Sequence, residues 1–167
     1  MIFKLKKHDN SLYNSLLTLS RNIFFYKNIG LKDNFETRIY LMFIHFSIMM
    51  IATKKKGQKF DQKSYDLFFH NIENDLRELG FGDISVNKKM KEFNKILYDI
   101  LLKIELTVKD QNKFIVNPKL ISKYFVELKD QKTKHFKVFE TYLSNFFHFC
   151  FELSYNNMIK KLLKFKN

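Results

Sequence analysis

The chain is poor in residues that break regular structure and in residues that cross-link a fold. Its 167 residues include 4 Gly, 1 Pro, 1 Cys and no Trp. Few Gly and Pro leave long stretches without turn signals, which disfavours a fold of many short strands and favours helices. The single cysteine, Cys150, excludes an internal disulfide and a Cys-Xaa-Xaa-Cys zinc site, so a reducing compartment is expected.

Long apolar runs are also missing. The basic start of the chain is not followed by an apolar run of the length that a signal peptide needs. The most apolar stretch, residues 39–52, contains His45 and Ser47 and is shorter than the roughly 20 residues that span a bilayer. We therefore expect a core helix there, no transmembrane helix, and a cytoplasmic location with peripheral contact with the inner membrane.

Aromatic and aliphatic residues are abundant. The composition is 46% hydrophobic and 17% aromatic, with 20 Phe and 8 Tyr, which is far above the level of a disordered chain. A chain of this length can bury roughly two thirds of its unfolded surface in one core. We predict a single domain that spans residues 1–167.

The formal net charge of +13 has two interpretations. A field of this sign attracts nucleic acid or an anionic membrane without any sequence specificity. However, only three of the 30 basic residues are arginine, and Asn, Ile and Phe are abundant too, which is also what coding bias in an AT-rich genome produces. Charge alone does not decide between a functional and a compositional origin.

Apolar residues at helical spacing predict an all-α bundle of about six helices. Asn34, Asp61 and the Asn117-Pro118 pair are typical helix starts, whereas Gly30 and Gly80 are typical helix ends. The last two predicted helices form a C-terminal part over residues 117–164. The six predicted helices cover residues 11–28, 34–53, 61–79, 85–106, 117–128 and 136–164.

The glycine-containing loop at residues 79–83 is not a phosphate cradle. It lacks the third glycine of a dinucleotide site and the Gly-Lys-Ser/Thr of a P-loop. We interpret Gly80 as a left-handed helix stop and expect Asp83 or Ser85 to cap the helix that follows.

Three lysines, Lys88, Lys89 and Lys91, fall in the first two turns of that following helix. Positive charge there opposes the helix dipole by about 0.3 to 1 kcal/mol per residue. One hypothesis is that they bind an anionic partner, either nucleic acid, lipid headgroups or an acidic protein segment. The alternative is that they are solvated surface lysines in a lysine-rich protein.

The second predicted helix carries Arg38, Met42, His45 and Met49 at spacings of three and four, and hence on one face. One interpretation is a methionine-lined groove that binds an apolar peptide segment of a partner. The other is a core stripe in which the histidine is hydrogen-bonded, as apolar helical stripes usually are.

Catalysis has almost no support. The five histidines include no pair at metal-ligand spacing with a nearby acid, and no serine lies in a Gly-Xaa-Ser-Xaa-Gly motif. Glu73 is most simply the partner of Arg77 in an ion pair within one helix. We expect a protein that is not an enzyme and has no metal, cofactor or small-molecule substrate.

Two stretches together resemble the ubiquinol-cytochrome c chaperone family. The first is similar to the family's Phe-Tyr, Gly, Pro-Asp-Thr and Gly-Arg-Phe followed by a helical His, and it consists of Phe25-Tyr26, Gly30, Asp33, Arg38 and His45. The second is similar to the family's Leu-Arg-Glu-Met-Gly-Val-Gly-Asp and basic helix, and it includes Arg77, Gly80, Gly82, Asp83, Val86, Lys88-Lys89-Met90-Lys91 and Tyr98. The match is best over residues 12–98, and it departs from the family at Lys32, Thr37 and Asp99-Ile100.

The resemblance implies an assembly chaperone that binds newly made or newly inserted cytochrome b and helps to assemble the cytochrome bc complex. It also implies contact with the ribosome and with a small assembly-factor partner. The alternative is a basic helical module that binds RNA or the ribosome in its own right. The two differ in salt response, because phosphate binding weakens steeply with salt and apolar capture does not.

Overall fold

The computed structural model describes residues 11–108 and 114–165, and the regular structure within these ranges is entirely helical, which confirms the all-α prediction. The N-terminal stretch tested above for a signal peptide lies mostly outside the described residues. The elements in chain order are α1 (Ser11–Ser20), α2 (Ile23–Lys27), α3 (Phe35–Lys55), α4 (Gln62–Glu78), α5 (Asp83–Thr107), α6 (Pro118–Tyr124), η1 (Val126–Leu128), α7 (Lys134–Glu152), α8 (Tyr155–Lys161) and η2 (Leu162–Lys164).

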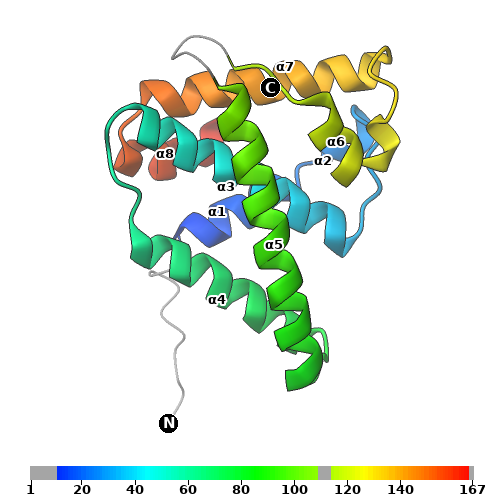
Figure 1. Ribbon diagram of the computed structural model, residues 1–167, viewed down its shortest axis with the longest axis vertical. Coiled ribbons are helices and arrows are strands. Elements are labelled where there is room, and N and C mark those ends of the chain that lie inside the picture. The colour runs from blue at the N-terminus through cyan, green and yellow to red at the C-terminus, as the bar shows by residue number, and fades with distance from the viewer. Residues whose placement is uncertain (1–10, 109–113, 166–167) are drawn as a thin grey trace.

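Helix α3 is the centre of the molecule. It packs against α1, α5 and α7, and Figure 1 shows α5 running past it along the long axis while α7 crosses one end. By length and composition α3 could cross a membrane, yet most of it is buried inside this fold. A helix that is apolar nearly all round is stable in water only when neighbours cover every side. The predicted core helix is therefore confirmed.

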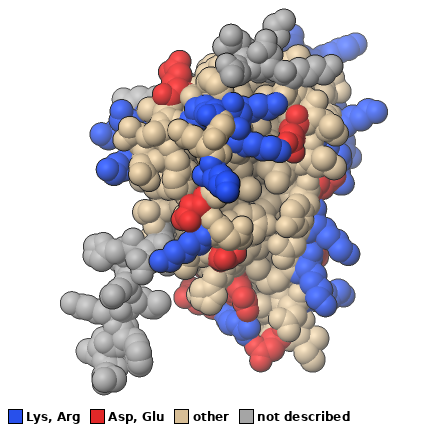
Figure 2. Space-filling view, turned by 60° about the vertical axis from the view of Figure 1, so that its left-hand side comes forward, with Lys and Arg blue, Asp and Glu red and all other residues tan. Residues whose placement is uncertain are grey.

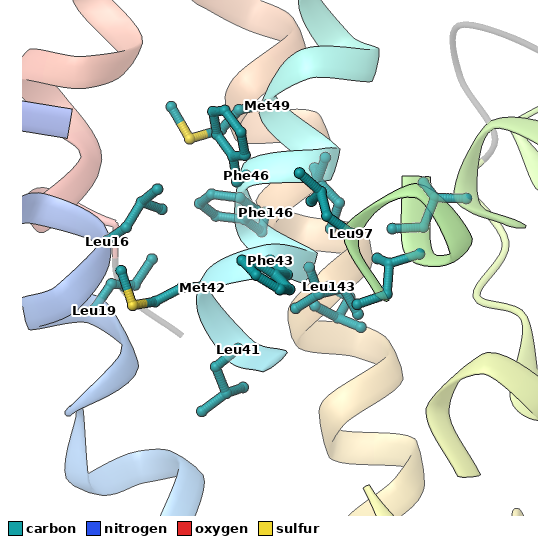
Figure 3. Packing of buried hydrophobic residues seen from close by; sticks show 14 of the residues in the cluster. Leu16, Leu19, Leu41, Met42, Phe43, Phe46, Met49, Leu97, Leu143 and Phe146 are labelled. Carbon is teal, nitrogen blue, oxygen red and sulfur yellow. The ribbon is translucent and has the colours of Figure 1, made fainter. Parts of the chain in front are cut away.

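The core surrounds α3 and takes side chains from α1, α3, α5 and α7, with further ones from α4, from α6 and from the shorter helices. It is rich in Phe, and many rings meet at tilted or edge-to-face angles, as in the pair Phe43 and Phe93, 6.1 Å between centroids. Figure 3 shows labelled side chains of α1, α3, α5 and α7 gathered around one interior: Leu16, Leu19, Leu41, Met42, Phe43, Phe46, Met49, Leu97, Leu143 and Phe146.

The three helix starts read from polar residues are confirmed. The Asn34 side chain accepts a hydrogen bond from the Thr37 amide at 2.8 Å and so caps α3. Asp61 caps α4 in the same way, and Asn117 caps α6 with proline in its first turn. Each cap satisfies backbone N–H groups that have no partner within the helix.

Three of the predicted helices are interrupted. The first breaks after α1, where the Asn22 side chain accepts from the amide of Phe24 at 3.1 Å and starts α2. The last breaks after α7, where Ser154 caps α8. The fifth ends at Tyr124 and continues as η1. Short Asn and Ser side chains compete for backbone N–H groups, so these two start new helices where apolar spacing alone suggested continuity.

Candidate partner-binding surface

The first family-like stretch braces the connection from α2 to α3. Asp33 and Arg38 form an ion pair at 2.7 Å, and the Tyr26 hydroxyl donates to the Ser20 carbonyl at 2.5 Å. Burial, followed by the charge of Asp33, raises the pKa of Tyr26, so the phenol stays a donor. Gly30 has φ of 80°, a value that only glycine adopts without strain. These residues shape the turn that leads into α3.

His45 is a buried, hydrogen-bonded member of the core. Its Nδ1 donates to the Leu41 carbonyl at 2.6 Å, and its Nε2 accepts from the Tyr142 hydroxyl at 2.7 Å. Burial lowers the His45 pKa to about 4, so the ring is neutral near pH 7. This satisfied side chain ties α3 to α7, as the core interpretation predicts.

The methionines on the same face of α3 do not form an open groove. Met42 and Met49 are both buried, and Figure 3 shows them among the core side chains. Of the four residues on this face, Arg38 alone reaches the surface, and it does so beside Asp33. The peptide-groove interpretation is therefore wrong for the closed fold, because core neighbours already cover these thioethers.

The second family-like stretch builds the turn from α4 to α5. Arg77 pairs with Glu73 at 3.0 Å, as predicted, and it also pairs with the carboxylate of Asp83. Gly80 has φ of 94° and ends α4, as expected of a glycine stop. The N-cap of α5 is Gly82, not Asp83 or Ser85 as predicted, because the ion pair with Arg77 holds the Asp83 side chain instead.

Arg38 from the first stretch lies close to the end of α4 from the second. A hollow of about 330 Å³ lies between α1, α3 and α4 at this point. Burial, followed by the charge of Glu78, raises the pKa of Asp75 to about 6. The residues that line the hollow include Arg21, Arg38, Met42, Asp75, Glu78 and Leu79.

The turn between α4 and α5 carries exposed apolar side chains that sequence reasoning missed. Leu79 is 59% exposed, Phe81 37% and Ile84 87%. In Figure 1 this end of α5 is the lowest described part of the molecule. The sequence does contain a signal for this exposure, because apolar residues here alternate with two glycines. Glycines have no side chains that could shield the apolar residues from water.

Helix α5 has one buried face and one face without a partner inside the described fold. The side chains of Val86, Phe93, Leu97, Ile100 and Ile104 point into the core. At 100° per residue, a stripe on the opposite side stays within about 40° of one line along the helix. The exposed stripe consists of Ile84, Lys88, Lys91, Lys95, Tyr98, Leu102 and Leu106.

The three predicted lysines differ in their surroundings. Lys88 and Lys91 are exposed on the stripe, whereas Lys89 is half-buried with its Nζ 5.1 Å from the centroid of the Phe81 ring. Figure 2 shows basic side chains spread over one whole side of the molecule with acidic ones among them. On the face in view the charge is therefore dispersed, and the stripe on α5 is defined by its alignment rather than by a high density of charge.

The described residues hold no group of three or more His, Cys, Asp or Glu side chains arranged to bind a metal ion. Cys150 is buried, and its burial raises the pKa of the thiol, so the sulfur is protonated near pH 7. The candidate surface consists of exposed apolar side chains and lysines on α5.

No curated protein and no solved structure matches this chain. The family model described as ubiquinol-cytochrome C chaperone matches residues 27–113, which are 87 of the 167 residues. The matched segment contains the braced turn before α3, the whole of α3 and α4, the glycine turn, and α5. Because the match covers more than half of the chain, and includes the first motif stretch from Gly30 onward and the whole of the second, this chain belongs to the ubiquinol-cytochrome C chaperone family.

Proposed function

We propose that this protein is an assembly chaperone of ubiquinol-cytochrome c reductase that acts by binding newly made cytochrome b. Membership of the family supports a role in assembly. The observation that carries the finer proposal is the outward face of α5, where Tyr98, Leu102 and Leu106 are each more than half exposed. A newly made membrane protein presents apolar helices, and an apolar helix face is the natural surface to hold one.

A hollow of about 410 Å³ beside this face extends the apolar surface between α3 and α5. Met50, Phe60 and Leu101 line it, and Lys54 and Glu105 form an ion pair at its edge. An apolar helix laid along α5 would contact the face and the rim of the hollow together. Recognition of this kind rests on apolar area with a polar rim and needs no catalytic group.

Crosslinking from the proposed face tests the client directly. A photoreactive amino acid replaces Leu102 in the tagged full-length protein, and bound proteins and RNA are recovered separately from native membranes. The matched control places the same amino acid at Val126, which is also more than half exposed but lies on η1. We expect a cytochrome b adduct from position 102 and none from position 126. Adducts from both positions, or cytochrome b absent from the recovered material, would contradict the proposal.

A charged substitution on the outward face of α5 gives a second test of the client proposal. Leu102→Glu should lower recovery of cytochrome b about tenfold or more, because a carboxylate cannot be buried against an apolar client without a partner. Val126→Glu should leave recovery unchanged. Neither side chain belongs to the core, so both variants are expected to fold. A thermal unfolding transition like that of the unmodified protein checks this.

A second candidate function is RNA or ribosome binding by the lysines of the stripe. The observation that favours it is the alignment of Lys88, Lys91 and Lys95 on one face of α5. Binding to phosphates would weaken steeply between low and physiological salt, whereas binding through Leu102 would not. Recovery of RNA without cytochrome b, lost at higher salt, would favour this function over the chaperone proposal.

A further inference from the structure

We propose that the tip of the α4–α5 turn inserts into the surface of a membrane that contains anionic lipids. The tip is defined as Leu79, Phe81 and Ile84. This inference concerns lipid and not the client protein, so it goes beyond the proposed function and does not depend on it.

The first observation is apolar surface at a projecting point. Ile84 is 87% exposed in the first turn of α5, and Leu79 and Phe81 flank Gly80 beside it. The ion pair between Arg77 and Asp83 joins the two helix ends behind the tip, and Arg77 is also paired with Glu73 within α4. The exposed side chains are therefore carried on a braced turn, and burying them in an acyl layer would remove apolar area from water without unfolding anything.

The second observation is the position of the lysines relative to the tip. A helical rise of 1.5 Å per residue places Lys88 about 6 Å and Lys91 about 10 Å behind Ile84 along α5, on the same face. An interfacial apolar residue lies about 5 to 10 Å deep, so these lysines would meet the headgroups when Ile84 meets the acyl chains. Long lysine side chains extend readily to such a boundary.

Charge on this face favours anionic headgroups. In the first four turns of α5, the charged residues on the line of Ile84 are Lys88, Lys91 and Lys95. Glu92 lies about 80° round the helix from Ile84. The acidic Asp83 pairs with Arg77, which also pairs with Glu73, so the positive charge on this face comes from the lysines and not from the turn itself. An RNA site would use the lysines equally well but would give no role to the exposed Ile84, so a lipid surface fits both observations.

A tryptophan reporter gives the first test. The chain contains no Trp, so Ile84→Trp places the one tryptophan at the tip, where it can be excited selectively over the tyrosines, and Val126→Trp creates a control on η1. Full-length protein is titrated with vesicles of phosphatidylcholine alone or mixed with phosphatidylglycerol. We expect a blue shift for the tip reporter with the mixed vesicles and none for the control. An unshifted tip reporter, or equal shifts from both, would overturn the proposal.

Vesicle flotation of charge variants gives the second test. Ile84→Glu should lower partitioning at least about tenfold, given the free energy of burying an isoleucine side chain. An acidic residue in the first turn of a helix is favourable, so the fold is expected to persist, and circular dichroism checks it. Lys88→Gln and Lys91→Gln should each lower partitioning about fivefold. Val126→Glu should change nothing.

The vesicle assay and the cytochrome b pull-down test the membrane proposal and the chaperone proposal independently. Vesicles contain no protein, so failure of vesicle binding leaves the cytochrome b proposal standing, and absence of cytochrome b from pull-downs leaves the membrane proposal standing. A third assay measures binding of an RNA oligonucleotide to the same variants. If RNA binding depends on Lys88 and Lys91 while Ile84→Glu leaves vesicle partitioning unchanged, the lysines belong to a nucleic-acid site and the membrane proposal is wrong.

Discussion

The two longest helices, α3 and α5, pack side by side and have opposite relations to solvent. Fourteen of the 21 residues of α3 are buried, against five of the 25 residues of α5, and the structure describes both helices completely. The charged residues of α3 are confined to its ends, whereas α5 carries charge along most of its length. One helix is used to hold the molecule together, and the other is left with a free face.

The difference separates the residues that stabilise the fold, on α3, from the partner surface proposed on α5. Substitutions that leave the core intact are tolerated on an exposed helix face, because surface side chains contribute little to folding. A partner surface on α5 can therefore vary in chemistry while α3 stays apolar. The comparison predicts large stability effects on α3 and small ones on α5, and the following changes test that division in order of size.

The largest effect should come from truncating an aromatic side chain of α3. Phe46 is fully buried beside Phe68, with 4.4 Å between ring centroids. Phe46→Ala should lower the free energy of unfolding by about 3 to 5 kcal/mol through lost burial and a cavity. Leu102→Ala on α5 should change it by no more than about 0.5 kcal/mol. Urea denaturation of both variants measures the contrast, and equal losses would break it.

The next effect is a pH dependence that originates in α3. His45 has a folded pKa of about 4 against an ordinary value of 6.5, so the unfolded chain binds more protons between these values. Stability from this group is fully present above pH 6.5 and is lost as pH falls through the window to about 4. The shift corresponds to about 3 kcal/mol.

Measurement of the free energy of unfolding across this window needs a matched variant. Asp75 titrates in the same pH range and changes the free energy of unfolding in the opposite direction. Its folded pKa is raised to about 6, so the stability that it contributes is lost as pH rises. His45→Gln keeps a donor and an acceptor but removes the titration, so its stability should fall less on acidification than that of the unmodified protein. Parallel pH curves for the two proteins would contradict the buried neutral histidine.

The turn that begins α5 should respond to one glycine and not to the other. Gly80 has φ of 94°, so Gly80→Ala should cost about 1 to 2 kcal/mol. Gly82 has φ of −73°, and a Cβ added at this position would have no neighbouring atom within 4 Å, so Gly82→Ala should be close to neutral. Thermal unfolding compares them, and similar losses would show that the local backbone conformation is not what stabilises the turn.

The smallest effect concerns the lysines at the start of α5. Lys88→Glu should raise the free energy of unfolding by no more than about 0.3 kcal/mol at low salt, because it replaces a charge that opposes the helix dipole from the second turn of α5, where that effect is already weak. The gain should shrink as salt is added. A stabilised variant that loses vesicle binding would show that Lys88 is retained for binding at a cost to the fold. Lower stability would contradict the dipole argument.

Much of the fold could be predicted because each helix carries its own signals. Asn34, Asp61 and Asn117 marked starts, and apolar spacing marked the faces, so α3 and α4 were placed closely. The breaks at Asn22 and Ser154 were missed because a polar residue within an apolar periodicity is ambiguous. Only tertiary packing decides whether such a residue faces solvent or starts a new helix.

The site was harder to predict than the fold. Arg38, Met42, His45 and Met49 share a helix face, but sequence spacing does not say which neighbour covers that face. The α7 residue that bonds His45, Tyr142, is 97 residues away in the sequence. Leu102 and Leu106 look like core residues by type, and their exposure follows from where the partners of α5 lie. Spacing could align the stripe on α5, whereas only the packed structure could show that nothing inside the described fold covers it.

The position of α3 between α1 and α7 has a consequence for biosynthesis. The ribosome makes α3 well before α7, which ends at Glu152, so the α3 surface that α7 covers stays open while most of the rest is translated. Contacts between segments so distant in sequence form slowly. This domain therefore completes its own core late, and until then it exposes the same kind of apolar helix that its proposed client presents.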